Sequence, residues 1–321
     1  MRVSHDVSAL PTFTALDGHA VLDGTRRGAS IQLDGTYFAG QLRALETFEG
    51  ALDAVSNADR ERRAVTLRTS RDRYDRIDVD VDSLTEPDLR TASDRFRRQL
   101  QRLQEVEYLE RGFPGRCFVV PEWLRLEDRL QYGARVYFFR NGDSPAPEDI
   151  VRKNIEAVVD GASETFERYQ GRLHGYPDCC IDFYYDRAPD TPPPEWRSVE
   201  PFADRIEDAA LGDGVSTSID DVLPRVSDWE DGYAFFAREF FPEPECDTAL
   251  SDGRTIHERL SASVPDRLVD DYFRLTFGYD YLVARSVRTG GSHRPTPGAL
   301  GREHLLFYLP LRDVLTVPRY R

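Results

Sequence analysis

The residues best suited to chemistry lie together in the middle of the chain. They read His174-Gly175-Tyr176-Pro177-Asp178-Cys179-Cys180-Ile181-Asp182-Phe183. This pattern predicts a helix start, because proline suits the first helical position and aspartate favours the positive end of the helix dipole. Cys179 and Cys180 are then expected in the first turn, where free N–H groups favour a thiolate over a thiol. Such a thiolate can act as a nucleophile or a metal ligand, with His174 as the candidate general base.

The same motif also has a purely structural interpretation. Buried cysteine behaves as a small hydrophobe, and Gly-Tyr-Pro is ordinary turn chemistry between two helices. Consecutive helical residues point about 100° apart, so we expect only one of the two sulfurs to face a given cleft. A disulfide between Cys179 and Cys180 is not expected, because the ring that it closes is strained.

A metal site is a third possibility for the cysteines. Cys179, Cys180 and Cys246, together with His174 or His257, supply four ligands soft enough for zinc or an iron–sulfur cluster. No pair of them shows CxxC or HxxxH spacing, which would be the sequence signature of such a site. The sequence therefore assigns no metal ligand, and the cofactor stays open.

The segment Gly175-Tyr176-Pro177-Asp178-Cys179-Cys180-Ile181-Asp182-Phe183 resembles the Gly-Tyr-Pro-x-Cys-Cys signature of an archaeal family, domain-of-unknown-function family 483. The resemblance covers mainly the middle of the chain and implies a haloarchaeal member of that family. Members of that family are expected to have further cysteines near the C-terminus, whereas Tyr308-Leu309-Pro310-Leu311-Arg312-Asp313 has none. This departure argues against a metal site shared with the family, and the resemblance implies no activity.

A basic segment at the C-terminus is the second candidate site. Residues 281–321 contain seven arginines against two acidic residues, Glu303 and Asp313. The candidate anion-binding residues are Arg285, Arg288, Ser292, His293 and Arg294, which surround a Gly-Gly turn. The alternative is that these arginines pair with the acidic region before them and fix the segment to the body of the protein. The turn matches neither a Walker loop nor GxGxxG.

Composition indicates the environment of the protein. The net charge is −15, and Lys153 is the only lysine among 42 basic residues. An acidic, arginine-rich surface is typical of a salt-rich cytosol, so the sequence predicts a halophilic, cytoplasmic protein. No apolar run approaches the ~20 residues that span a bilayer, and the four scattered cysteines predict no disulfide framework. Nucleic-acid binding is not expected, because acidic residues interrupt the arginine-rich span 61–140.

The elements that would position these residues follow from hydrophobic spacing. Helical spacing occurs in residues 42–55, 93–112, 148–172, 229–240 and 268–281, with Ser93 as the N-cap of the second. Strand patterns occur in residues 64–69, 77–81, 117–120 and 136–139. The sequence thus predicts an α+β fold that is helix-rich, with a small sheet in the N-terminal half.

Three parts are expected along the chain. Residues 1–187 form an α+β part that ends with the cysteine motif, residues 188–199 a proline-rich linker, and residues 200–321 a mainly helical part. The linker assignment rests on Pro189 and on three consecutive prolines at 192–194.

Two hypotheses of function follow. The first is a thiol-centred enzyme that acts on an anionic small molecule through Cys179 or Cys180, with His174 as base. It requires His174, the cysteines and Arg288 or Arg294 to line one pocket. The alternative is a non-catalytic binding or scaffold protein that contacts a partner protein or RNA through its basic C-terminal segment.

Overall fold

The computed structural model describes residues 7–49, 57–113, 115–126, 129–140, 142–186, 191–207, 218–222, 224, 230–291 and 299–321. The chain forms two units. Unit 1 comprises Met1–Val3, Tyr176–Tyr308 and Val317–Arg321, and unit 2 comprises Ser4–Gly175 and Leu309–Thr316. The main boundary between the units therefore falls after Gly175, inside the cysteine motif. The sequence prediction places the end of the first part at residue 187.

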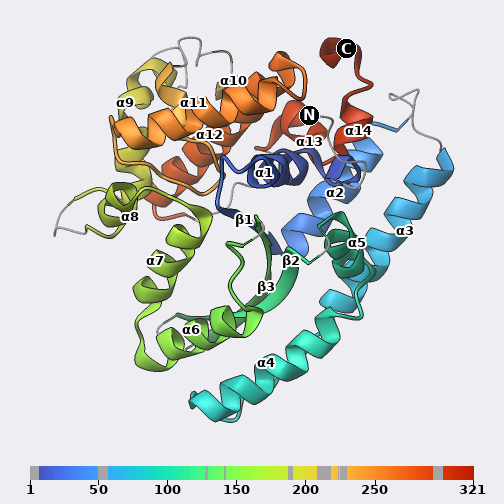
Figure 1. Cartoon of the computed structure of the whole chain (residues 1–321), viewed down its shortest axis with the longest axis vertical. Helices are drawn as coiled ribbons and strands as arrows, with labels where there is room; N and C mark the ends of the chain where they lie inside the picture. The colour runs from blue at the N-terminus through green and yellow to red at the C-terminus, as the bar shows by residue number, and fades with distance from the viewer. Residues whose placement is uncertain are drawn as a thin grey trace. The chain divides into compact units, whose positions relative to one another are not determined.

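Unit 2 contains the sheet. Its elements are η1 (Val7–Ala9), α1 (Thr12–Asp23), β1 (Gly28–Leu33), α2 (Gly35–Thr47), α3 (Asn57–Tyr74), α4 (Glu86–Leu100), α5 (Gln104–Gly112), β2 (Cys117–Leu126), β3 (Arg129–Phe139), α6 (Pro147–Asp160), α7 (Ser163–His174) and α14 (Leu311–Val314) (Figure 1). The three strands are antiparallel in the order β1-β3-β2, and Val136 of the central strand pairs with Ile31 on one side and Val119 on the other.

Helices cover both faces of this sheet. The residues from Val136 to Phe139 are completely buried, as a continuous apolar run predicts for a strand covered on both sides. Tyr137 and Phe139 pack with residues of α6 and α7, including Ile150 and Leu173, in one core cluster. Phe138 points to the opposite face, because side chains alternate along a strand. There its ring meets Phe113, which follows α5, at a centroid distance of 4.9 Å.

The predicted α+β class is confirmed, and so are two of the predicted strands. Residues 117–120 lie in β2 and residues 136–139 in β3. Two other strand predictions are wrong: residues 64–69 belong to α3, and residues 77–81 form no strand. Within α3, Leu67 is buried whereas Val65 is 58% exposed, so the packing of one face outweighs the β-propensity of Val and Thr. Strand β1 was not predicted, because its Gly28-Ala29 start weakens the alternation of Ile31 and Leu33 with polar residues.

Two predicted helices are each divided in the structure. Residues 93–112 contain the end of α4 and all of α5, and Ser93 lies inside α4, where its Oγ accepts a hydrogen bond from Trp123 Nε1 at 2.7 Å. Residues 148–172 contain α6 and most of α7, separated at Gly161, whose φ of 67° ends α6 in the left-handed conformation. Periodicity identified the buried faces correctly but not these breaks.

All the regular elements among the described residues of unit 1 are helices. Its elements are α8 (Asp178–Tyr185), α9 (Pro194–Glu207), α10 (Ile219–Val222), η3 (Glu230–Ala234), α11 (Asp247–Ser261), α12 (Asp266–Arg288), α13 (Gly301–Leu306) and η4 (Pro318–Tyr320). Helix α9 begins at Pro194, so residues 194–199 of the predicted linker are helical. A proline is compatible with this position because the first turn of a helix does not need its missing N–H. Residues 187–190 lie outside the described residues.

Two further features of unit 1 bear on the sequence predictions. The helix predicted for residues 268–281 is confirmed within α12. The helix predicted for residues 229–240 is wrong, because the described part of this range forms only the short η3 and irregular chain. Trp229 lies outside the described residues. Among the helices described in either unit, none combines the length and apolar composition needed to cross a membrane.

Candidate metal centre

The start of α8 positions Cys179 and Cys180. Pro177 precedes the helix with φ −56° and ψ 136°, and Asp178 is the first helical residue, so the predicted helix start is confirmed one residue later than expected. The ring of Tyr176 stacks on Phe240 at a centroid distance of 4.2 Å. This contact holds the beginning of α8 against the chain that leads to the third cysteine.

The start of α11 positions Cys246. Cys246 is the N-cap residue of the helix, and its Sγ accepts a hydrogen bond from the N–H of Ala249 at 3.4 Å. Gly253 brings α11 close to η3, because a Cβ at this position would lie 1.7 Å from the carbonyl oxygen of Tyr233. Packing against η3 therefore helps to determine where Cys246 lies.

Hydrogen bonds fix the irregular chain between η3 and Cys246. The N–H of Glu239 donates to Asp280 Oδ1 at 2.8 Å, and Ser198 Oγ donates to the carbonyl oxygen of Pro242 at 2.6 Å. The N–H of Glu243 donates to Cys180 Sγ at 3.4 Å. The last bond joins the chain to α8 through one of the candidate sulfurs itself.

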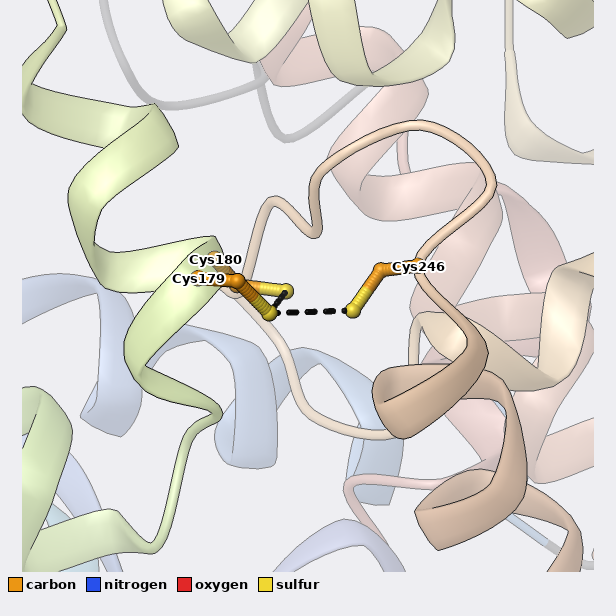
Figure 2. A group of neighbouring side chains, drawn as sticks. All are labelled: Cys179, Cys180 and Cys246. Atoms are coloured by element: carbon orange, nitrogen blue, oxygen red, sulfur yellow. Dashed lines mark hydrogen bonds between the residues drawn. The ribbon is translucent and has the colours of Figure 1, made fainter.

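These elements bring three sulfurs together, as Figure 2 shows. Cys179 Sγ lies 3.2 Å from Cys246 Sγ and 4.0 Å from Cys180 Sγ, and all three sulfurs lie within 4.8 Å of one another. The prediction that only one of the vicinal sulfurs faces a given site is wrong. Their Cα–Cβ bonds diverge, but rotation about χ1 lets both sulfurs turn toward the same side of the helix.

Burial distinguishes the three thiols. Cys180 is 1% exposed, Cys246 is half-buried and Cys179 is exposed. Burial raises the pKa of Cys180. The pKa of Cys179 is raised first by its partial burial and second by its hydrogen bond with the Cys246 thiol. These directions are opposite to the lowering that the helix start predicts. Cys179 and Cys180 are therefore protonated at neutral pH unless a cation stabilises their thiolates.

The histidines considered as partners lie elsewhere. His174 belongs to unit 2, where it is buried and stacks on Tyr137 at 6.1 Å. Burial, together with Arg135 and Arg26, keeps the pKa of His174 well below 6.5, so its ring is neutral. His257 Nε2 pairs with Asp270 Oδ1 at 2.8 Å. The role of His174 as a base stays a prediction.

The predicted anion-binding residues are only partly described. Arg285 and Arg288 lie in the last turn of α12, and the Arg288 guanidinium is stacked over the Trp196 ring at 4.0 Å. Ser292, His293 and Arg294 lie outside the described residues. Arg288 thus contacts an aromatic ring of its own unit, and the anion-binding role of the segment stays a prediction.

Asp280 anchors the cysteine-bearing chain and gives it a pH dependence. Burial raises its pKa well above the usual value, and Oδ2 has no hydrogen-bond partner among the described residues. The folded state thus binds a proton that the unfolded state loses above about pH 4, so folding becomes less favourable as pH rises toward the raised pKa. As pH rises through that range, we expect wild type to lose up to ~1.4 kcal/mol of stability per pH unit relative to Asp280→Asn.

Denaturant unfolding of both proteins between pH 4 and pH 8, at fixed salt, measures this difference. The exposed carboxylate of Glu258 on α11 provides the control, and Glu258→Gln is expected to run parallel to wild type. Parallel curves for Asp280→Asn as well would show that Asp280 ionises normally in the folded protein.

Comparison with known proteins finds no matching family model, no matching curated protein and no matching solved structure. The resemblance of the Gly-Tyr-Pro-x-Cys-Cys segment to an archaeal family therefore stays a prediction. Function has to be argued from the cysteine site.

Proposed function

We propose that Cys179, Cys180 and Cys246 bind one zinc ion and that the chain is a thiol-centred metalloenzyme. The observation that carries this proposal is the convergence of three sulfurs within 4.8 Å of one another. Two of them come from the first turn of α8 and one from the N-cap of α11, so two separate elements meet at this point. Thiolates are among the preferred ligands of zinc.

The spacing of the sulfurs favours zinc over an iron–sulfur cluster. Tetrahedral bonds of about 2.3 Å from zinc to sulfur place thiolates ~3.8 Å apart. The distances of Cys179 Sγ to the other two sulfurs, 3.2 and 4.0 Å, lie on either side of this value. The thiolates of a cluster are divided between two or more irons, so three of them would be more widely separated than these three sulfurs are.

The number of ligands that converge among the described residues, three, favours an enzyme over a purely structural site. Structural zinc sites are closed by four protein ligands, whereas catalytic sites use three and leave one position to water or substrate. Cys179 is exposed, so water or a substrate would reach an ion held by these sulfurs from its side. A zinc ion with an open position supplies Lewis-acid activation of a bound oxygen.

The charge of the site defines the substrate. Three thiolates exceed the charge of Zn²⁺, and Asp178 and Asp247 flank the cysteines in sequence. An anionic small molecule, which the sequence suggested, would be repelled here. The proposed substrate of the cysteine centre is therefore uncharged or cationic.

Cobalt substitution tests the proposal. We expect the reduced protein to bind about one Co²⁺ per chain, with a thiolate-to-cobalt charge-transfer band and the intense visible bands of a tetrahedral ion. Imidazole, an uncharged ligand, should shift the visible bands if the fourth position is open. Absence of cobalt and zinc binding would eliminate the metal centre, and bands that imidazole leaves unchanged would eliminate the open position and with it the enzyme.

The scaffold alternative has less support. It expects an exposed basic segment, but Arg319 pairs with Glu303 at 2.7 Å and lies 3.7 Å from Asp271. Arg288 also stacks on Trp196. Both of these arginines of the segment therefore make contacts within their own unit.

A further inference from the structure

A second cluster of chemically capable side chains lies in unit 2, where a cavity of about 200 Å³ opens beside α3. Its charged lining consists of Asp59, Arg60, Arg62, Arg63, Arg312 and Asp313. The first four come from the beginning of α3, and the last two come from the C-terminal segment Leu309–Thr316, which belongs to the same unit. Four of the residues that line this cavity are arginines, although the chain as a whole has a net charge of −15.

We propose that this cavity is a binding site for a small phosphate-class oxyanion. The proposal is independent of the cysteine centre, because every residue of the cavity belongs to unit 2 and every cysteine of the centre to unit 1. Guanidinium groups present several N–H donors in a planar fork, which matches the oxygens of phosphate.

Arg63 is held rigidly at the base of the cavity. It donates to Glu105 through both terminal nitrogens and to Gln41, and its guanidinium lies 4.2 Å from the centre of the Tyr108 ring. Glu105 is completely buried. A guanidinium fixed in this way loses little conformational entropy when a ligand arrives, which favours binding.

Arg60 and Arg312 have donors that no described residue uses. Arg60 donates to the carbonyl oxygen of Leu45 at 2.7 Å, which orients its guanidinium and uses one of five donors. Arg312 approaches Asp313 at 3.6 Å, longer than a hydrogen bond, and its side chain is 55% exposed. An anion between these two groups would gain charge-assisted hydrogen bonds from each.

Charge and size define the ligand class. Four arginines against Asp59 and Asp313 leave a positive lining, although Glu105 offsets the charge of Arg63 from behind. The cavity is smaller than the roughly 300–1,000 Å³ of pockets for drug-sized ligands. It therefore suits inorganic phosphate or the phosphate group of a small metabolite, and not a nucleic acid.

Titration calorimetry with inorganic phosphate, in chloride buffer at constant ionic strength, tests the site. We expect saturable binding of one phosphate per chain, weakened at least 10-fold in the double variant Arg60→Gln, Arg312→Gln. A 10-fold change corresponds to about 1.4 kcal/mol, and loss of one charged hydrogen-bonding partner of the anion is already enough to produce it. The matched control is Arg68→Gln, because Arg68 lies on the same helix, outside the cavity lining, and its side chain is 55% exposed. The control should bind phosphate as wild type does.

A parallel titration with glycerol phosphate separates the two sources of the anion. Tighter binding than that of inorganic phosphate identifies a phosphorylated metabolite, and weaker binding identifies free phosphate; both support the site. Should the double variant fail to fold, Arg312→Gln alone replaces it, since this exposed side chain contributes little to packing. Absence of saturable binding, or equal affinity in variant and wild type, would show that the arginines only fix the C-terminal segment to α3.

Discussion

Cys180→Ser and Cys246→Ser are each expected to abolish zinc binding at the three-sulfur site. Each substitution keeps the size of the side chain but removes one of three thiolate ligands, and two remaining ligands cannot hold the ion against water. Affinity should fall by more than the ~100-fold that follows from loss of an outer-shell partner. Metal content per chain, measured after dialysis with reducing agent present, gives the result.

The fourth cysteine provides the control for this experiment. Cys117 lies in β2 of unit 2, where it is buried and where burial raises the pKa of its thiol. Cys117→Ser can lower stability but should leave one zinc per chain. A zinc chelator should lower the Tm of wild type and of this control, and leave the Tm of Cys180→Ser and Cys246→Ser unchanged. Equal metal content in all four proteins would remove the three-sulfur centre from consideration.

Glu105→Gln should cause a large loss of stability in unit 2. Glu105 is completely buried and accepts hydrogen bonds from Tyr37 Oη and from both terminal nitrogens of Arg63. Glutamine has nearly the same shape but leaves the Arg63 charge without its counter-ion. Breaking one partner of a buried pair costs about 3–5 kcal/mol, which is a large part of the stability of a typical domain.

Urea unfolding followed by circular dichroism measures this loss, and zinc affinity should not change because the cysteines belong to unit 1. Glu86→Gln is the matched control, since Glu86 pairs with Arg90 four residues later with both side chains about half exposed. An exposed pair of this kind contributes less than about 0.5 kcal/mol. A loss below ~1 kcal/mol in Glu105→Gln would mean that Arg63 finds water or another partner.

Local patterns predicted the fold class and, to within one residue, the start of α8. The helix start at Asp178 follows from Pro177 and Asp178 themselves, and the central strand follows from its continuous apolar run. The failures lie where tertiary contacts outweigh local preference. Residues 64–69 favour a strand by composition, yet Leu67 is buried as part of a helix.

Convergence of distant residues was beyond prediction from spacing. Cys179 and Cys246 are 67 residues apart, and no metal-binding spacing links them. Their contact depends on the chain between Phe235 and Cys246, which is bonded to Asp280, Ser198 and Cys180 outside that segment. The cavity beside α3 was missed for the same reason, because Arg60 and Arg312 come from opposite ends of the sequence.

The return of residues 309–316 to unit 2 has a consequence for folding. Thr12 Oγ1 donates to the carbonyl oxygen of Leu309 across 297 residues of chain, and the N–H of Leu311 donates to the carbonyl oxygen of Leu10. These contacts form only after all of the 176–308 segment has been synthesised. Closing so long a loop slows folding, and until then the partner surface on α1 and η1 is uncovered. A nascent chain therefore spends most of its synthesis with this surface open to a chaperone or to another copy of itself.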